Sequence, residues 1–259
     1  MKENKYDDGV FFDKYSSMGR SKNGLEDAGE WHELKKMLPD FQGKRVLDLG
    51  CGFGWHCRFA VENGAKSVIG IDLSQNMLRE AKTKTTSERV QYLCIPIEEI
   101  DFPIDSFEVV ISSLAFHYLQ SFDQILSKIS HCLSNGGDFV FSVEHPIFTA
   151  QGPQDWYYDN QGNPLHWPVD QYFTEGLRKT NFLGEEVIKY HKTLTTYLNG
   201  LIKAGFEITG VVEPKPAENS LDSDPDMLDE LRRPMMLLIS ARKSKPIPGQ
   251  AYPLAEQLC

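Results

Sequence analysis

Along residues 45–242, short apolar runs alternate with stretches in which apolar positions recur at helical spacing. The short runs are rich in β-branched and aromatic residues and predict strands, whereas the longer stretches predict helices. This alternation is typical of a mainly parallel sheet whose strands are joined by helical crossovers. The predicted strands are 45–49, 67–71, 90–94, 107–112, 137–143, 207–212 and 235–241, and the predicted helices are 55–63, 75–85, 122–133 and 194–204.

Local signals refine the connections of this sheet. Ser74 is a predicted helix N-cap, and the run Ser134-Asn135-Gly136-Gly137 is predicted to be a helix exit. The last two predicted strands are separated by a segment without a crossover of the usual size, so we expect the final strand to be antiparallel. The predicted fold is therefore a doubly wound α/β sheet of seven strands, mainly parallel, with an antiparallel last strand.

Two segments fall outside this rhythm. Residues 1–43 precede the first strand and are predicted to form helices that cover the ligand edge of the sheet. Residues 146–190 combine aromatic side chains with glycine and proline, and a loop of this length is unusual unless it is a lid or a binding element. We therefore predict a helical cover at 1–43, a core at 44–145 and 191–243, an aromatic lid insertion at 146–190 and a tail at 244–259.

Composition and charge narrow the class of protein. The chain has 259 residues and a formal net charge of -10, which argues against a protein that grips a phosphate backbone. It contains neither an apolar run long enough to span a bilayer nor a signal peptide, so we expect a cytoplasmic protein without a membrane partner. Five cysteines without CxxC spacing suggest reduced thiols and no metal site. We expect a monomer or a homodimer.

The first predicted strand ends in a turn with glycine at alternate positions, Gly50, Gly52 and Gly54. Such a turn brings bare backbone against a ligand, and a nucleotide-like cofactor is the natural occupant. The dinucleotide fingerprint requires a third glycine where this chain has Trp55, because that glycine allows close packing of helix and strand. The spacing therefore disfavours NAD and FAD.

The run from Asp48 to Gly54 resembles motif I of the class I S-adenosylmethionine-dependent methyltransferases, a Rossmann-like family, and further motifs recur in order up to Ala241. The resemblance implies that Asp72 binds both ribose hydroxyls and that Ile97 and Glu98 contact adenine, although Pro96 stands where the family commonly has an aspartate. Within the family the chain looks most like the small-molecule branch, the type 11 and quinone-biosynthesis methyltransferases. The cofactor-binding residues that we expect are Asp48, Gly50, Cys51, Gly52, Gly54, Asp72, Leu73, Met77, Ile97, Glu98, Ser113, Leu114 and His117, while Tyr15 and Arg20 either close over the amino-acid end of the cofactor or only pack.

The resemblance implies in-line transfer of a methyl group from S-adenosylmethionine to oxygen, nitrogen or carbon of a small molecule. A proton acceptor for this reaction would be a histidine, and we rank His191 first because it lies where the insertion returns to the sheet, with His117 and His145 as the other candidates. The aromatic insertion could stack on a flat substrate or enclose a cationic amine. The alternatives are a macromolecule methyltransferase acting on RNA or protein, a non-catalytic binding module, and an NAD-dependent oxidoreductase.

Overall fold

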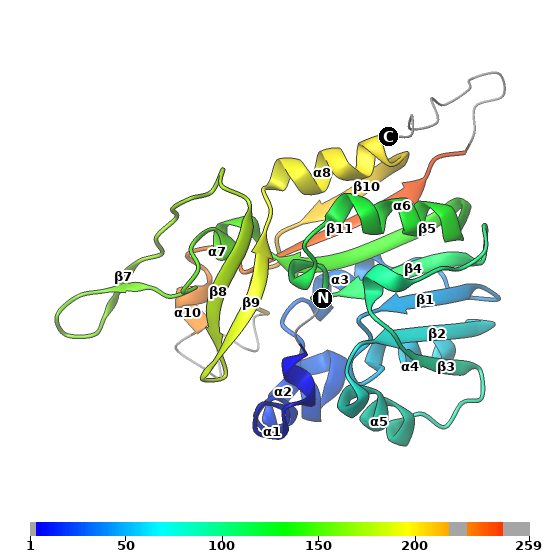
Figure 1. Cartoon of the computed structure of the whole chain (residues 1–259), viewed down its shortest axis with the longest axis horizontal. Coiled ribbons are helices and arrows are strands. Elements are labelled where there is room, and N and C mark those ends of the chain that lie inside the picture. Colours follow the sequence, from blue (N-terminus) through cyan, green and yellow to red (C-terminus); the bar gives the residue numbers. More distant parts are fainter. Residues whose placement is uncertain (1–3, 218–226, 246–259) are drawn as a thin grey trace.

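The computed structural model describes residues 4–217 and 227–245, and its centre is one seven-stranded sheet (Figure 1). The strand order is β10-β11-β5-β4-β1-β2-β3, and the last strand, β11, is antiparallel to both of its neighbours. The expected antiparallel final strand is therefore confirmed. The strands are β1 (Arg45–Leu49), β2 (Ser67–Asp72), β3 (Val90–Cys94), β4 (Phe107–Ser113), β5 (Leu133–Glu144), β10 (Phe206–Val212) and β11 (Met236–Lys243).

Helices cover both faces of this sheet, as a doubly wound fold requires. On one face, α6 and α8 bury apolar side chains such as Ile125 and Leu201 against the strands. On the other face, α4 contributes Cys57 and Ala60, and α3 contributes Trp31. The helices of this cover are α3 (Trp31–Met37), α4 (Trp55–Glu62), α5 (Gln75–Lys84), α6 (Phe122–Cys132) and α8 (Leu194–Lys203).

Side-chain caps explain where three of these helices begin. Ser74 accepts a hydrogen bond from the Met77 N–H at the start of α5, which confirms the predicted cap. Ser121 caps α6 and Thr193 caps α8 in the same way. Since α5 and α8 follow directly on strands β2 and β9, these caps fix the points at which the chain turns at the ligand edge of the sheet.

Two groups of elements lie beside the carboxyl ends of the parallel strands, at the left of the sheet in Figure 1. The N-terminal group is helical, as predicted, and the second group is inserted between β5 and α8. The Lys14 ammonium donates to the Leu183 carbonyl at 3.0 Å and so joins the two groups. They comprise η1 (Lys5–Asp7), α1 (Gly9–Ser17), α2 (Gly19–Lys22) and η2 (Gly24–Asp27), and then α7 (Pro146–Ala150), β6 (Tyr157–Tyr158), β7 (Pro164–His166), β8 (Gly176–Phe182) and β9 (Glu185–His191).

The structure differs from the sequence prediction at two places. The predicted helix exit at 134–137 is instead the first part of β5, which starts directly after α6 because buried Leu133 pairs with Phe107 of β4. The insertion is not a long loop, since β6 pairs with β7 and β8 pairs with β9 in two antiparallel hairpins. Most of the predicted tail lies outside the described residues.

Within the described residues, no helix has the length and apolar character that crossing a bilayer requires. The same residues contain no group of three or more His, Cys, Asp or Glu side chains that could hold a metal ion.

Candidate active site

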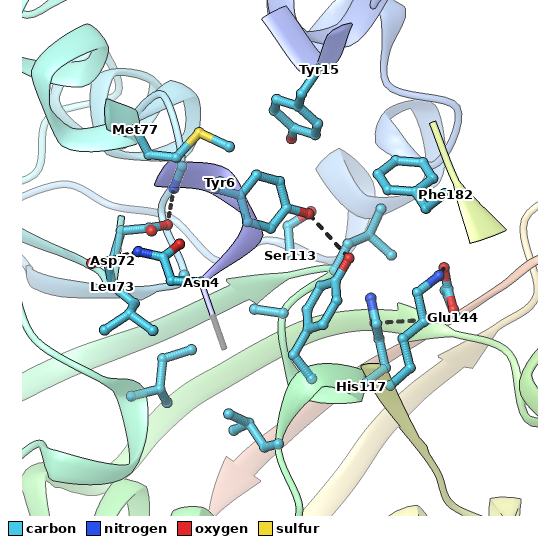
Figure 2. A pocket seen from close by; sticks show the side chains of 18 of the residues that line it. Asn4, Tyr6, Tyr15, Asp72, Leu73, Met77, Ser113, His117, Glu144 and Phe182 are labelled. Carbon is cyan, nitrogen blue, oxygen red and sulfur yellow. Dashed lines mark hydrogen bonds and ion pairs between the residues drawn. The ribbon is translucent and has the colours of Figure 1, made fainter. Parts of the chain in front are cut away.

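A cavity of about 410 Å³ lies at the carboxyl ends of β1, β2 and β4. This edge is where open α/β sheets bind ligands, at the point where the strand order reverses. The residues that line the cavity form two groups (Figure 2). Asp72, Asn4 and Met77 lie at one side, and His117, Glu144 and Phe182 lie at the other, with Tyr6 between them.

The glycine turn supplies bare backbone to the first side. The N–H groups of Gly50 and Cys51 both donate to the Ile71 carbonyl at 2.8 Å, which ties the turn to the end of β2. Gly50 has a φ of +77°, and a Cβ there would lie 2.5 Å from the Ala115 Cβ. Nothing lies within 4 Å of a Cβ built on Gly52, so its backbone faces open space. The turn therefore needs glycine for two different reasons, close packing at Gly50 and an open cradle at Gly52.

Asp72 closes β2 and faces the same space. One of its carboxylate oxygens accepts from the Gly52 N–H at 2.9 Å, and the other accepts from the Ser74 N–H at 2.9 Å. Burial raises the pKa of Asp72 to about 6, so the group is largely ionised at neutral pH. Each oxygen has a further lone pair, and the carboxylate can accept two more hydrogen bonds from a ligand.

The N-terminal cover adds an ion pair beside the glycine turn. The Arg20 guanidinium donates to Glu30 at 3.1 Å, and the same carboxylate oxygen accepts from the Ser113 hydroxyl at 3.1 Å. Burial raises the pKa of Glu30, but the charge of Arg20 together with hydrogen bonds such as that from Ser113 outweighs burial and holds the pKa below its ordinary value. Both Arg20 and Ser113 line the cavity. The positive group on this wall is therefore the Arg20 guanidinium, which Glu30 holds in place.

A second, smaller cavity of about 60 Å³ adjoins the turn and is also lined by Arg20. Its other lining residues include Trp55 and His56. The Nε1 of Trp55, the Nε2 of His56 and one oxygen of Glu30 make no hydrogen bond within the described residues. Buried polar groups without partners are costly, so the Trp55 and His56 nitrogens on the wall of this cavity indicate a place for a polar ligand group.

A closed hydrogen-bond network forms the wall at the other side. The Lys189 ammonium lies 2.5 Å from one oxygen of Glu144, and the Gln154 amide donates to the other oxygen at 2.8 Å. The Gln154 carbonyl in turn accepts from Lys189 at 2.9 Å and from the Thr180 hydroxyl at 2.8 Å. Because Thr180 and Lys189 belong to β8 and β9, this network holds the hairpin against the end of β5.

The three candidate histidines occupy different surroundings. His117 lines the cavity, and its Nδ1 accepts from the Glu144 N–H at 3.4 Å (Figure 2). His191 is fully buried, with its ring nitrogens 2.8 Å from the Thr149 hydroxyl and 2.8 Å from the Tyr172 carbonyl. His145 caps α7. In the described part of the chain neither His191 nor His145 lines the cavity, and the structure therefore does not support our first-ranked position.

The aromatic insertion holds a cation that belongs to the protein itself. The Arg233 guanidinium lies 4.1 Å from the ring centroid of Trp167, 4.6 Å from that of Phe148 and 5.4 Å from that of Trp156. Phe148 also stacks on Trp167 at 5.0 Å. These rings fix the insertion to the segment that precedes β11, and Arg233 occupies the place that we considered for a cationic amine.

Most of the predicted cofactor residues surround the cavity. Asp48 does not, since it is buried beneath the turn and accepts a hydrogen bond from the Cys57 thiol at 3.2 Å. Gly54 does not line it either, because it packs against Tyr92. Cys51 lines the smaller cavity. The predicted residues that line the large cavity are Gly50, Gly52, Asp72, Leu73, Met77, Ile97, Glu98, Ser113, Leu114, His117, Tyr15 and Arg20.

Several lining residues were not predicted. Glu144 had a usable signal, since it directly follows a predicted strand at the edge where ligands bind. The others come from the N-terminal segment, from the turn after β4 or from the insertion, and their positions depend on tertiary packing. The unpredicted lining residues include Asn4, Tyr6, Met18, Tyr118, Leu119, Phe148, Gln154, Asn181, Phe182 and Lys189.

The chain is similar to known methyltransferases. A family model described as a methyltransferase domain matches residues 47–141. A Haemophilus influenzae tRNA U34 carboxymethyltransferase is 30% identical over 135 residues, which are 49% of this chain and 42% of that protein. The chain therefore spans less than half of that relative.

Two crystal structures match much more of the chain. The first is named as a proposed S-adenosylmethionine dependent methyltransferase from Listeria monocytogenes, with 61% identity, a TM-score of 0.79 and coverage of 84% of this chain and 99% of that one. The second is an S-adenosylmethionine dependent methyltransferase from Mesorhizobium loti, with 44% identity, a TM-score of 0.78 and coverage of 85% and 100%. Since these likenesses extend over most of the chain, it belongs to the class I S-adenosylmethionine-dependent methyltransferases, and S-adenosylmethionine is its cofactor.

Proposed function

We propose that this enzyme methylates a small molecule that binds between His117 and Phe182. The observation that carries the proposal is the enclosure of that side of the cavity, where the hairpin β8–β9 is held to β5 by the network around Glu144. The whole cavity, which the acceptor would share with the cofactor, is about 410 Å³, within the range of small-molecule sites, roughly 300–1,000 Å³. A site covered in this way suits a metabolite better than a polymer.

The cofactor fits the first side of the cavity. We infer that Asp72 accepts hydrogen bonds from the ribose hydroxyls, because its two oxygens retain acceptor capacity beside the open backbone of Gly52. Leu73 and Met77 on one side and Ile97 on the other would enclose the adenine ring. A side chain at Gly50 would clash with Ala115, which follows β4. The glycine turn therefore stays close to the end of β4, and this closeness supports the same position for the cofactor.

The smaller cavity suits the amino-acid end of the cofactor. Arg20 and the indole N–H of Trp55 both line this cavity and are donors that would hold a carboxylate. The Trp55 N–H, which has no partner within the described residues, would then have one. This pairing supports the orientation in which the reactive end of the cofactor points towards His117.

When bound, S-adenosylmethionine supplies a methyl group that is already activated by the sulfonium. The chain's own residues then have to align the acceptor and exclude water, and positioning of this kind can supply about 7–11 kcal/mol of the barrier. Tyr6 and Tyr118, whose hydroxyls are 3.0 Å apart, lie where the two sides of the cavity meet and can set the depth to which an acceptor enters. The hairpin and the N-terminal cover would exclude bulk water.

The test uses S-adenosylmethionine labelled in its methyl group. We expect the full chain to transfer the label into the low-molecular-weight fraction of a metabolite extract, and not into tRNA or protein added in parallel. The tRNA arm is included because a partial relative acts on tRNA U34, whereas the net charge of -10 opposes an RNA substrate. Label in tRNA alone would overturn the proposal in favour of a nucleic-acid substrate, and no transfer to any fraction would favour a non-catalytic binding module.

A further inference from the structure

The wall around Glu144 offers little to a cationic substrate. Both carboxylate oxygens already have partners, Lys189 on one and Gln154 on the other. Burial raises the pKa of Glu144, but the charge of Lys189 and the hydrogen bonds from Lys189 and Gln154 lower it, and the pKa lies below its usual range, so the group stays ionised. Its charge is matched by that of Lys189, whose side chain is only 3% exposed. The Glu144 charge is therefore already balanced within the protein, and this wall presents no uncompensated negative charge to an amine.

His117 has one ring nitrogen committed to the protein. Its Nδ1 accepts the N–H of Glu144, and an imidazole nitrogen that accepts a hydrogen bond carries no proton of its own. Burial lowers the pKa of His117 to about 4, so the ring is neutral at pH 7. The single proton of the neutral ring must then lie on Nε2, the nitrogen that is not bonded to Glu144.

Nε2 of His117 faces the cavity. The ring lies beside Tyr118 with the two centroids 4.5 Å apart, and His117 lines the cavity together with Tyr118 and Glu144 (Figure 2). A ring nitrogen that carries a proton cannot take up another from the acceptor, because its lone pair is part of the aromatic system. The group that this wall presents is a hydrogen-bond donor.

We propose that His117 recognises the methyl acceptor by donating from Nε2 to a lone-pair oxygen on it, such as a carbonyl, and that it is not the proton acceptor of the reaction. The proposal rests on the proposed small-molecule function and narrows its substrate class to neutral or anionic molecules with such an oxygen. His117 is then a specificity-determining residue. Cationic amines are poor substrates, because they carry no lone pair for this donor.

Two substitutions separate a donor from a base. His117→Gln keeps an N–H donor at a similar reach but cannot accept a proton at neutral pH, whereas His117→Phe keeps a ring and removes the donor. The readout is the initial rate of transfer of labelled methyl groups into the small-molecule fraction of the extract. We expect His117→Gln to stay within about threefold of the unmodified enzyme and His117→Phe to lose about tenfold or more, since a buried acceptor would be left without a partner.

Calorimetry with S-adenosylhomocysteine is the control, because it separates a loss of methyl transfer from a loss of cofactor affinity; His117 lies across the cavity from Asp72 (Figure 2), so in His117→Phe the affinity should fall by less than the rate. Equal losses in both variants, with that affinity kept, would show a base and overturn the proposal. Full activity of His117→Phe would also overturn it. If the unmodified enzyme labels only tRNA, the proposed function fails first and the inference fails with it.

A measurement on the unmodified protein avoids any dependence on how the variants fold. The nitrogen-15 chemical shifts of the His117 ring report which nitrogen carries the proton. We expect a protonated Nε2 and a bare Nδ1 between pH 6 and pH 8. A proton on Nδ1, or a ring that titrates in this range, would contradict the donor role even if methyl transfer to small molecules is observed.

Discussion

Two buried aspartates near the glycine turn differ in their hydrogen-bond partners and in their pKa values. Asp72 has backbone donors on both oxygens, whereas Asp48 has only the Cys57 thiol on one oxygen, and its other oxygen makes no hydrogen bond within the described residues. Burial accordingly raises the pKa of Asp72 to about 6 and that of Asp48 to about 7. The aspartate with ligand-facing oxygens is thus the one that stays ionised at neutral pH.

Asp72→Ala should weaken binding of S-adenosylmethionine. A hydrogen bond to a charged group contributes about 1.5–3 kcal/mol, so the dissociation constant should rise by roughly tenfold or more. Titration calorimetry at pH 8 measures it, and Asp40→Ala, which removes an exposed carboxylate, serves as the control. An affinity of Asp72→Ala equal to that of the control would refute the assignment of Asp72 to the ribose.

Asp48→Asn should change how stability depends on pH. The folded pKa of Asp48 lies above its ordinary value of 3.8, so the folded state binds the extra proton and loses stability as pH rises from about 4 to about 7. The variant lacks this loss and should gain on the order of 3 kcal/mol relative to the unmodified protein across that window. Urea unfolding at pH 4.5, 6 and 8 tests this, and a difference that is constant over these pH values would contradict it.

At the scale of elements, two glycines of the same turn are needed for different reasons, packing and ligand binding, which sequence alone cannot distinguish. Gly50 and Gly52 both have positive φ, at +77° and +51°. A side chain at Gly50 meets Ala115, whereas a side chain at Gly52 meets only the space proposed for the cofactor. The first position is therefore constrained mainly by packing, and the second mainly by the ligand.

Alanine substitutions should reveal this difference. We expect Gly50→Ala to lose more stability than Gly52→Ala, because it adds a steric clash to the backbone strain of about 1–2 kcal/mol that both variants share. Gly52→Ala should fold but lose most of its affinity for S-adenosylmethionine. Thermal unfolding without ligand and calorimetry with ligand give the two quantities. Gly9→Ala, with nothing within 4 Å of its added Cβ, is the control.

The hairpin β8–β9 depends on a buried ion pair. Lys189→Met would leave the Glu144 charge without its cation, and removing one partner of a buried pair costs about 3–5 kcal/mol. In a double-mutant cycle, Glu144→Gln with Lys189→Met should cost clearly less than the sum of the single changes. The exposed pair Lys179–Glu186 on the same hairpin is the control, and Lys179→Met should cost less than about 1 kcal/mol. Additive costs at Glu144 and Lys189 would contradict the coupling.

The elements that the sequence predicted well are those with strong periodicity. Each strand of the main sheet starts and ends near its prediction, except that β5 begins at Leu133 because a register shift between Phe107 and Val109 accommodates its glycines. The hairpin β8–β9 was missed for a different reason. Its turn residues Leu183 and Gly184 both have positive φ, and leucine rarely adopts that conformation, so the usual Asn-Gly or Asp-Gly signal is missing.

At the scale of the whole molecule, the cofactor side of the site could be predicted because its residues follow the ends of successive strands. Asp72 and Ser113 are examples, and both line the cavity. The acceptor side could not be predicted, since Lys189 and Gln154 reach Glu144 only after the insertion has docked on the sheet. His191 does not line the cavity, although its position in the sequence looks favourable, because its ring is held between the Thr149 hydroxyl and the Tyr172 carbonyl of the insertion.

The intact protein should respond to ligands selectively. A ligand present at a hundred times its dissociation constant stabilises the folded state by about 2.7 kcal/mol. We therefore expect S-adenosylmethionine and S-adenosylhomocysteine to raise the melting temperature by several degrees, and NAD to leave it unchanged. Differential scanning fluorimetry measures all three, and a comparable shift with NAD would contradict the reading of the glycine turn.

The order of the strands has a consequence for biosynthesis. β11 lies between β5 and β10 and is the last of the three to leave the ribosome. Until Lys243 has been synthesised, β10 lacks its hydrogen-bonded neighbour in the sheet, and the edge of β5 stays open. Nascent chains that stall before residue 236 would expose this edge, which is a template for pairing with other chains. Completion of the fold therefore has to wait for the final strand.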